Sequence, residues 1–193
     1  MSQKTKTDKP KISKYIDKII YNEEQINEAI KKIALWIDQT YKDSNDLVIV
    51  GLLKGCVPFL AQLIKYINVD CQIDFMIASS YHGKSFSSGN VKIVMDLSLD
   101  IAGKDILVVE DVIESGITIQ KTLDILGARN PKSLRVVSLL DKTAVANANI
   151  KIDQVGFKVK ENLFLIGFGL DYQEKLRNLP YIGTMNKKYI NDK

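Results

Sequence analysis

The sequence has little histidine, cysteine or proline, and it contains no long apolar run. Its single histidine, His82, argues against a His-rich metal site and against Ser-His-Asp catalysis. Its two cysteines, Cys56 and Cys71, lack the CxxC spacing of a metal site, so we expect a reducing, cytoplasmic compartment. No stretch approaches the roughly 20 apolar residues of a membrane-spanning helix, and the first residues lack the apolar run of a signal peptide. We therefore expect no membrane partner.

The charge of the chain is nearly balanced, and much of its small excess lies at one end. The net charge of +4 over 193 residues is too weak to indicate nucleic-acid binding, and it suits an anionic small-molecule substrate equally well. Five lysines lie within the first fourteen residues, among other polar residues. We expect residues 1–14 to form a disordered basic tail and residues 15–193 to form a single domain.

Five short apolar runs mark the predicted strands. Each run is continuous rather than alternating, which is typical of a strand that is covered on both faces. The runs span residues 47–50, 75–78, 106–109, 136–140 and 164–166. Helical patterns lie between them. This alternation predicts an α/β fold with a doubly wound, mainly parallel sheet and helices on both faces.

Three helices are predicted from apolar positions that share one face. The first spans about residues 23–41 and turns Trp36 toward the core together with three isoleucines. The second opens at Pro58 and carries Ile64 on its apolar face. The third spans residues 118–126 and is stopped by Gly127.

The most informative segment is residues 106–118, where a buried strand is followed by two carboxylates, a small-residue turn and a helix. Ligands of open parallel sheets bind beyond the carboxyl ends of the strands, which is where Glu110 and Asp111 lie. Ser115 and Gly116 let the backbone approach an anion at the helix N-terminus, and the hydroxyl of Thr118 can add a hydrogen bond. Acidic residues at this place can also simply cap the helix. A phosphate cradle beside acidic partners for a diol or a metal ion indicates a phosphorylated sugar.

This segment resembles the phosphoribosyl-pyrophosphate motif of the type I phosphoribosyltransferases, and its apolar flanks with Glu110-Asp111 resemble those of the hypoxanthine-guanine members. The chain has neither a GxGxxG nor a GxxxxGK[ST] motif. The resemblance extends from Ile19 to Met185. It implies the type I fold, with a small base-binding hood formed by the N- and C-terminal segments. It also implies transfer of a phosphoribosyl group to hypoxanthine or guanine, which yields IMP or GMP and pyrophosphate.

The resemblance assigns roles around the phosphoribosyl group. Residues Leu53-Lys54-Gly55 are similar to the family's pyrophosphate loop, in which a non-proline cis peptide is common, so Lys54 and Gly55 are expected to bind substrate. Ser80-Tyr81 resembles a flexible loop that closes over the reacting centre. The 5′-phosphate is expected to bind the loop made of Ser115, Gly116, Ile117 and Thr118.

The resemblance also assigns the base end and the metal. Lys142 is expected to donate to the oxygen at purine position 6, Phe164 to stack on the purine, and Leu165 to read its edge through backbone groups. Arg177 corresponds to an arginine that contacts pyrophosphate. The implied cofactor is Mg²⁺, with three candidate ligands: Glu110, Asp111 and Asp171. Backbone groups near Asp171 are also expected to read the purine edge.

One residue departs from the family pattern. Glu114 stands where the family usually has Asp, the expected general base, and its extra methylene displaces the carboxylate oxygens by about 1 Å. Such a displacement can affect catalysis, so the assignment of Glu114 as the base is open.

Alternative functions stay open at this point. One is an enzyme that prefers xanthine. Another is a non-catalytic regulator that senses phosphoribosyl pyrophosphate, although such a protein usually needs a basic face or a helix-turn-helix module that this chain lacks. An adenine enzyme is disfavoured because it has no use for a cation facing position 6. The expected partners are phosphoribosyl pyrophosphate and a 6-oxopurine, without nucleic acid, in a homodimer or homotetramer.

Overall fold

The computed structural model describes residues 13–80 and 91–190, with only the backbone described for residues 79, 80 and 91. Of the expected site residues, Tyr81 and the side chain of Ser80 therefore lie outside what is described. Over the described ranges, no helix is both long enough and apolar enough to cross a membrane.

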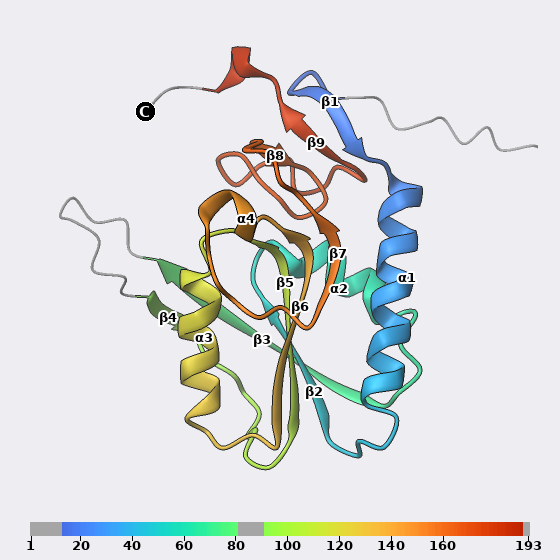
Figure 1. Ribbon diagram of the computed structural model, residues 1–193, viewed down its shortest axis with the longest axis vertical. Coiled ribbons are helices and arrows are strands. Elements are labelled where there is room, and N and C mark those ends of the chain that lie inside the picture. The colour runs from blue at the N-terminus through green and yellow to red at the C-terminus, as the bar shows by residue number, and fades with distance from the viewer. Residues whose placement is uncertain (1–12, 81–90, 191–193) are drawn as a thin grey trace, which may run out of the picture.

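A six-stranded sheet forms the centre of the molecule (Figure 1), in the order β4-β3-β2-β5-β6-β7. Its strands are β2 (Leu47–Leu52), β3 (Cys71–Ser80), β4 (Val91–Met95), β5 (Asp105–Ile113), β6 (Ser133–Asp141) and β7 (Gln154–Lys158). Five neighbouring strands, β3, β2, β5, β6 and β7, are parallel, and β4 pairs antiparallel with β3. The mainly parallel sheet predicted from the sequence is confirmed.

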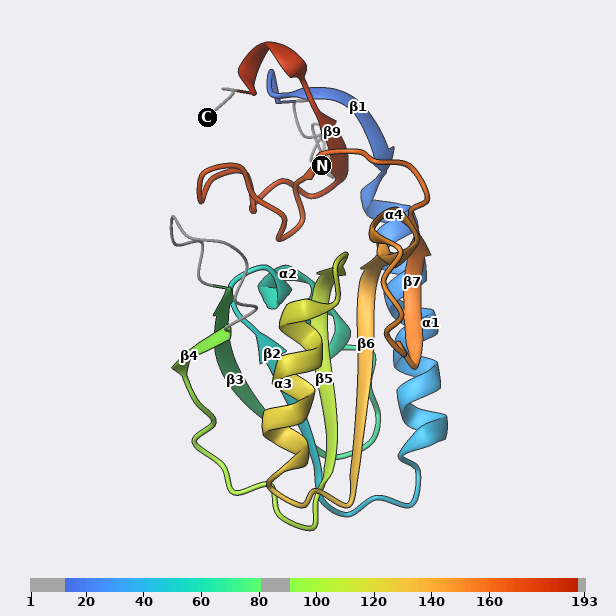
Figure 2. The same cartoon turned by 60° about the vertical axis from the view of Figure 1, so that its left-hand side comes forward.

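Helices cover both faces of this sheet (Figure 2). On one face lie α1 (Glu23–Thr40) and α2 (Cys56–Leu63), and on the other lies α3 (Ile117–Gly127). Each face of the sheet packs against its helices through an apolar core, and alternate residues of β2 belong to the two cores. Leu47 and Ile49 pack with α1 and α2, whereas Val48 and Val50 pack with α3. Because successive side chains of a strand point to opposite faces, filling both cores requires a continuous apolar run. A short helix, α4 (Thr143–Ala146), follows β6.

Two helix predictions differ from the structure at single residues: Trp36 packs against the core but is only partly buried, and the prediction for Ile64 is wrong. In α1 the inward position is taken by Ile37, which is fully buried, while Trp36 is half-buried at the margin of the core. The second helix ends at Leu63, so Ile64 falls outside it and is 38% exposed. In a helix with 3.6 residues per turn, a shift of one position rotates a side chain by about 100°, which is enough to move it away from the core.

A second, antiparallel sheet of three strands joins the two ends of the chain. Its order is β1-β9-β8, formed by β1 (Ile16–Tyr21), β9 (Ile182–Met185) and β8 (Leu165–Ile166). It lies beyond the carboxyl ends of the parallel strands (Figure 2). A 3-10 helix, η1 (Lys187–Tyr189), follows β9. This sheet forms the small hood expected from the N- and C-terminal segments.

The structure corrects the expected place of the apolar run at residues 164–166. Leu165 and Ile166 form β8 of the hood, and the last parallel strand of the central sheet is β7. β7 lies at the edge of the sheet, and none of its residues is fully buried. A strand at such an edge needs no continuous apolar run, so the sequence pattern did not reveal it.

The last residues of the predicted tail contact the hood. The backbone N–H of Ser13 donates to the hydroxyl of Tyr181, 2.9 Å away. The Nζ atom of Lys14 lies 5.8 Å from the centre of the Tyr189 ring, which packs against the apolar residues of the hood. Ser13 and Lys14 therefore pack with the hood.

Candidate active site

A pocket of about 790 Å³ opens between the carboxyl ends of the parallel strands and the hood. It brings together residues that the sequence analysis assigned to one site, although they are far apart in the chain. The expected site residues that line this pocket are Lys54, Gly55, Glu110, Asp111, Thr118, Leu165, Asp171 and Arg177. The assembly of these residues around one space follows from the parallel sheet, whose strands all end at the same edge.

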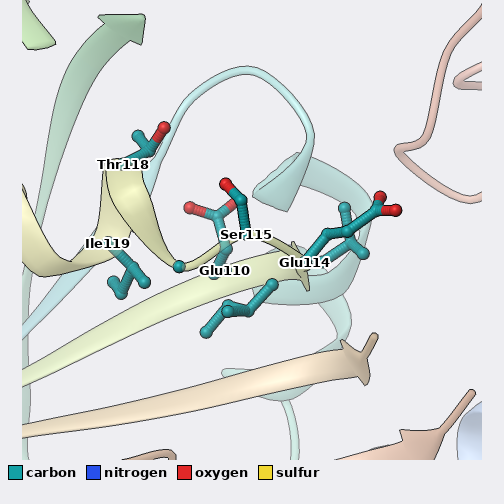
Figure 3. A pocket seen from close by; sticks show the side chains of 8 residues that line it. Glu110, Glu114, Ser115, Thr118 and Ile119 are labelled. Carbon is teal, nitrogen blue, oxygen red and sulfur yellow. The ribbon is translucent and has the colours of Figure 1, made fainter. Parts of the chain in front are cut away.

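The loop between β5 and α3 forms a smaller pocket of about 180 Å³, lined by Glu110, Glu114, Ser115, Gly116 and Thr118 among others (Figure 3). Gly116 has a φ of 74°, in the left-handed region that favours glycine. The N-cap residue of α3 is Gly116, which has no side chain to cap the helix. The first N–H groups of a helix have no partner within the helix, and they carry its positive dipole end. This loop is therefore suited to bind a phosphate through its backbone.

Ile117 contributes to this loop through its backbone. Its side chain is half-exposed and lines a neighbouring groove, while its N–H lies 3.5 Å from the Ser115 hydroxyl oxygen.

Figure 3 shows the Glu114 side chain extending away from Glu110 and Ser115. The side chains of Glu110 and Glu114 therefore face different parts of the site.

The loop after β2 contains the feature that the resemblance implied. The peptide bond between Leu53 and Lys54 is cis. Gly55 packs so closely against the carboxylate of Asp111 that a Cβ atom at position 55 would overlap it. From the other side, Gly169 of the hood packs against the carbonyl oxygen of Gly55. Neither glycine can gain a side chain unless the surrounding loops move.

Near the end of β5, the neighbouring carboxylates of Glu110 and Asp111 interact with each other. Asp111 is buried, and its carboxylate packs against Gly55. The Oε1 atom of Glu110 accepts a hydrogen bond from the backbone N–H of Asp111 over 3.3 Å. Burial, together with the neighbouring Asp111 carboxylate, raises the pKa of Glu110 well above its ordinary value. A divalent cation or a ribose diol would stabilise the charged form of such a pair.

The base end of the site is organised around Lys142, at the end of β6. Its side chain is 9% exposed, and its Nζ lies 3.0 Å from Glu114 Oε2 and 3.1 Å from the carbonyl oxygen of Leu163. Lys142 is therefore a buried residue and not a solvated surface lysine. A pocket of about 290 Å³ lies beside it, lined by Glu114, Lys142, Phe164 and Leu165 among others.

Phe164 borders this base-end pocket and is not part of the core. It is 49% exposed, and its ring meets that of Tyr172 edge to face, with the ring centres 5.9 Å apart. An exposed aromatic face at the rim of a pocket can stack on a planar ligand.

The part of the pocket that is expected to bind pyrophosphate contains a network of charges that the sequence analysis did not foresee in full. Arg177 lies 3.0 Å from Asp171 Oδ1 and 3.3 Å from Glu174 Oε1, and it also donates to the carbonyl oxygen of Gly169. Glu174 Oε2 accepts from Lys54 Nζ over 2.9 Å. Lys54 first, and then Arg177, holds the pKa of Glu174 below its ordinary value. The sequence analysis missed Glu174. Its position between Asp171 and Arg177 was the one available signal.

A family model described as the phosphoribosyl transferase domain matches residues 18–173. The chain belongs to the phosphoribosyltransferase family. It is 44% identical over 170 residues to the hypoxanthine-guanine phosphoribosyltransferase of Bacillus subtilis, covering 88% of this chain and 93% of that protein. The enzyme of the same name from Lactococcus lactis is 42% identical over 180 residues, covering 93% and 97%.

Solved structures support the same assignment. A hypoxanthine phosphoribosyltransferase from Staphylococcus aureus superposes with a TM-score of 0.86 at 40% identity, covering 92% of this chain and 96% of that one. A hypoxanthine-guanine phosphoribosyltransferase from Bacillus anthracis superposes with a TM-score of 0.82 at 37% identity, covering 89% and 99%. The predicted resemblance and the predicted type I fold are confirmed.

The acidic residues of this phosphoribosyltransferase fit magnesium only together with other ligands. Glu110, Asp111 and Asp171 line one pocket, but within residues 13–80 and 91–190 no three His, Cys, Asp or Glu side chains are grouped closely enough to hold a metal ion. Protein-bound Mg²⁺ usually takes one or two carboxylates and completes its shell with substrate phosphates and water. The donor set therefore fits an ion that arrives with a phosphorylated substrate.

Proposed function

We propose that this chain is a purine-salvage enzyme that transfers the phosphoribosyl group of phosphoribosyl pyrophosphate to hypoxanthine or guanine and releases pyrophosphate. The observation that carries this proposal is the contact between Lys142 and Glu114. It places a buried cation and a carboxylate at the edge of the base-end pocket, next to the phosphate loop of residues 114–118.

The phosphoribosyl group would be positioned by three parts of the site. The backbone N–H groups of residues 115–118 would hold the 5′-phosphate, and Glu110 and Asp111 would hold the ribose hydroxyls. Lys54, the backbone at Gly55, and Arg177 would stabilise the charge that builds on the leaving pyrophosphate. Bound Mg²⁺, held by substrate oxygens and by one or two of the candidate carboxylates Glu110, Asp111 and Asp171, would neutralise part of that charge.

The purine would bind between the hood and the end of β6. Phe164 would stack on its face, and backbone groups near Leu165 and Asp171 would meet its edge. Lys142 would donate to the oxygen at position 6, which makes the ring N–H more acidic, and Glu114 would accept the proton as the ring nitrogen attacks the ribose carbon. Lys142 and Glu114 form an ion pair with each other. A bound 6-oxopurine would accept from Lys142 and donate to Glu114, and would thereby replace this ion pair.

The Ser80-Tyr81 segment would close over the reacting centre and exclude water from the activated sugar. This part of the proposal rests on the resemblance of the segment, because Tyr81 lies outside the described residues. The free thiols of Cys56 and Cys71 suit a cytoplasmic enzyme. The proposal also keeps the expected homodimer or homotetramer.

The experiment is a turnover assay with labelled hypoxanthine, phosphoribosyl pyrophosphate and magnesium chloride, followed by competition with guanine, xanthine and adenine. We expect IMP as the product, with guanine an effective competitor and adenine a poor one. A higher catalytic efficiency with xanthine would reassign the substrate. Tight binding of phosphoribosyl pyrophosphate without formation of any nucleotide would indicate the regulator instead.

A further inference from the structure

Glu174 joins two cations that come from distant parts of the chain. Its Oε2 atom accepts from Lys54 Nζ over 2.9 Å, and its Oε1 atom lies 3.3 Å from an Arg177 nitrogen. Lys54 is 120 residues away from Glu174 in the chain. All three residues line the pocket of about 790 Å³. One protein carboxylate thus bridges both cations that are assigned to the pyrophosphate group.

The backbone of Glu174 is tied down, while its side chain is free to leave. The N–H of Glu174 donates to Asp171 Oδ2 over 2.8 Å, and Tyr172 and Lys175 pair across the turn. The side chains of Glu174 and Lys54 are each 63% exposed. Exposed ion pairs of this kind contribute little to stability, because water solvates the separated partners well. Breaking the bridge therefore costs little.

We propose that Glu174 is a positioning residue that occupies Lys54 and Arg177 in the absence of substrate and is displaced by the pyrophosphate group. This inference rests on the proposed function. A pyrophosphate group carries more negative charge than one carboxylate, so it can replace Glu174 at both cations. The displaced carboxylate then competes with the product for the same cations. Glu174 thereby weakens pyrophosphate binding and assists its release.

The test is calorimetric titration of the full-length protein with inorganic pyrophosphate in magnesium chloride. Glu174→Gln keeps the size of the side chain and removes its charge. We expect pyrophosphate to bind about two- to tenfold more tightly, which corresponds to the removal of one or two exposed ion pairs as competitors. GMP, which has no pyrophosphate group, should bind as it does to the unaltered protein. The KM for phosphoribosyl pyrophosphate should fall in the same direction.

A matched control is Glu28→Gln. Glu28 is an exposed carboxylate on α1 that accepts from Lys31 over 3.0 Å, and it lies outside the site. This variant should leave pyrophosphate binding unchanged. A second variant, Glu174→Asn, suits the φ of 62° at this position and should behave like Glu174→Gln.

Unchanged or weaker pyrophosphate binding by folded Glu174→Gln would overturn the inference, since it would mean that the carboxylate does not compete or that it organises the cations for the ligand. The proposed function is judged separately, by turnover of the unaltered protein. If that protein binds pyrophosphate but makes no nucleotide, the function fails while the titration still decides the role of Glu174.

Discussion

The site presents positive charge in two different ways, one at its phosphate end and another at its base and pyrophosphate ends. At the phosphate end, the loop of residues 114–118 offers backbone N–H groups at the uncapped start of α3. At the base and pyrophosphate ends, the cations are side chains that already have carboxylate partners: Lys142 with Glu114, Lys54 with Glu174, and Arg177 with Asp171. The backbone preorganises the phosphate end, whereas under the proposed function the side chains at the other end would exchange these carboxylate partners for substrate.

This difference suits the two tasks of the site. A phosphate that stays bound throughout the reaction gains from donors that cannot turn away. A leaving group and a base that must enter and depart gain from side chains whose charge is balanced in their absence. A bare cluster of cations would bind the pyrophosphate product tightly and slow its release, whereas internal carboxylates limit that affinity.

Chelation of divalent ions has the largest expected effect. EDTA should abolish turnover, because the pyrophosphate end depends on an ion to neutralise its ligand, and added magnesium should restore it. GMP binding, measured by calorimetry in EDTA, should persist because the phosphate end acts through N–H groups. Full turnover in metal-free buffer would contradict the proposed mechanism, and loss of GMP binding would contradict the contrast between the two ends.

Substitution of the expected base comes next. Glu114→Gln keeps the size of the side chain and removes the proton acceptor, so kcat should fall about 10²–10⁴-fold. Binding of phosphoribosyl pyrophosphate should stay nearly intact. Glu114→Asp, which restores the usual family residue, should keep substantial activity. Single-turnover rates across pH give the measurement, and an unchanged rate and pH profile in Glu114→Gln would remove Glu114 from the catalytic residues.

Much of the phosphate end could be predicted because its parts are contiguous. Glu110, Asp111 and Gly116 lie within one strand-turn-helix segment, and local rules for such segments place the carboxylates and the helix N-terminus together. The parallel sheet was also predictable from its continuous apolar runs. The edge strand β7 was missed because partial exposure leaves no such run.

The other end depends on contacts between distant residues, which local patterns do not encode. Lys142 could be assigned through family resemblance, but its burial depends on Glu114 and the Leu163 carbonyl, 28 and 21 residues away in the chain. The contact between Glu174 and Lys54 spans 120 residues and was not foreseen. The run at residues 164–166 was placed in the wrong sheet because apolar length alone does not identify a strand's neighbours.

Truncation of Lys142 should have a smaller effect than removal of the base. Lys142→Ala loses a charge-assisted hydrogen bond worth about 1.5–3 kcal/mol, which is about a ten- to 150-fold loss of kcat/KM for hypoxanthine. Discrimination against adenine should fall as well. Lys158→Ala, at the exposed carboxyl end of β7, is the control and should change neither quantity. If Lys142→Ala keeps both its efficiency and its base preference, Lys142 does not read position 6.

The smallest expected effect tests whether backbone shape alone determines phosphate affinity. Gly116 and Gly103 have φ values of 74° and 71°, and a Cβ at either position meets no contact closer than 3.5 Å. Gly116→Ala and Gly103→Ala should therefore each lower the free energy of unfolding by about 1–2 kcal/mol, the cost of a left-handed alanine. Only Gly116→Ala should also raise the KM for phosphoribosyl pyrophosphate, by about two- to tenfold, as expected when one backbone hydrogen bond is weakened. Denaturant unfolding and steady-state kinetics on both variants separate strain from function. Equal KM values in the two variants would show that the loop tolerates the change and that phosphate affinity does not depend on the conformation of Gly116.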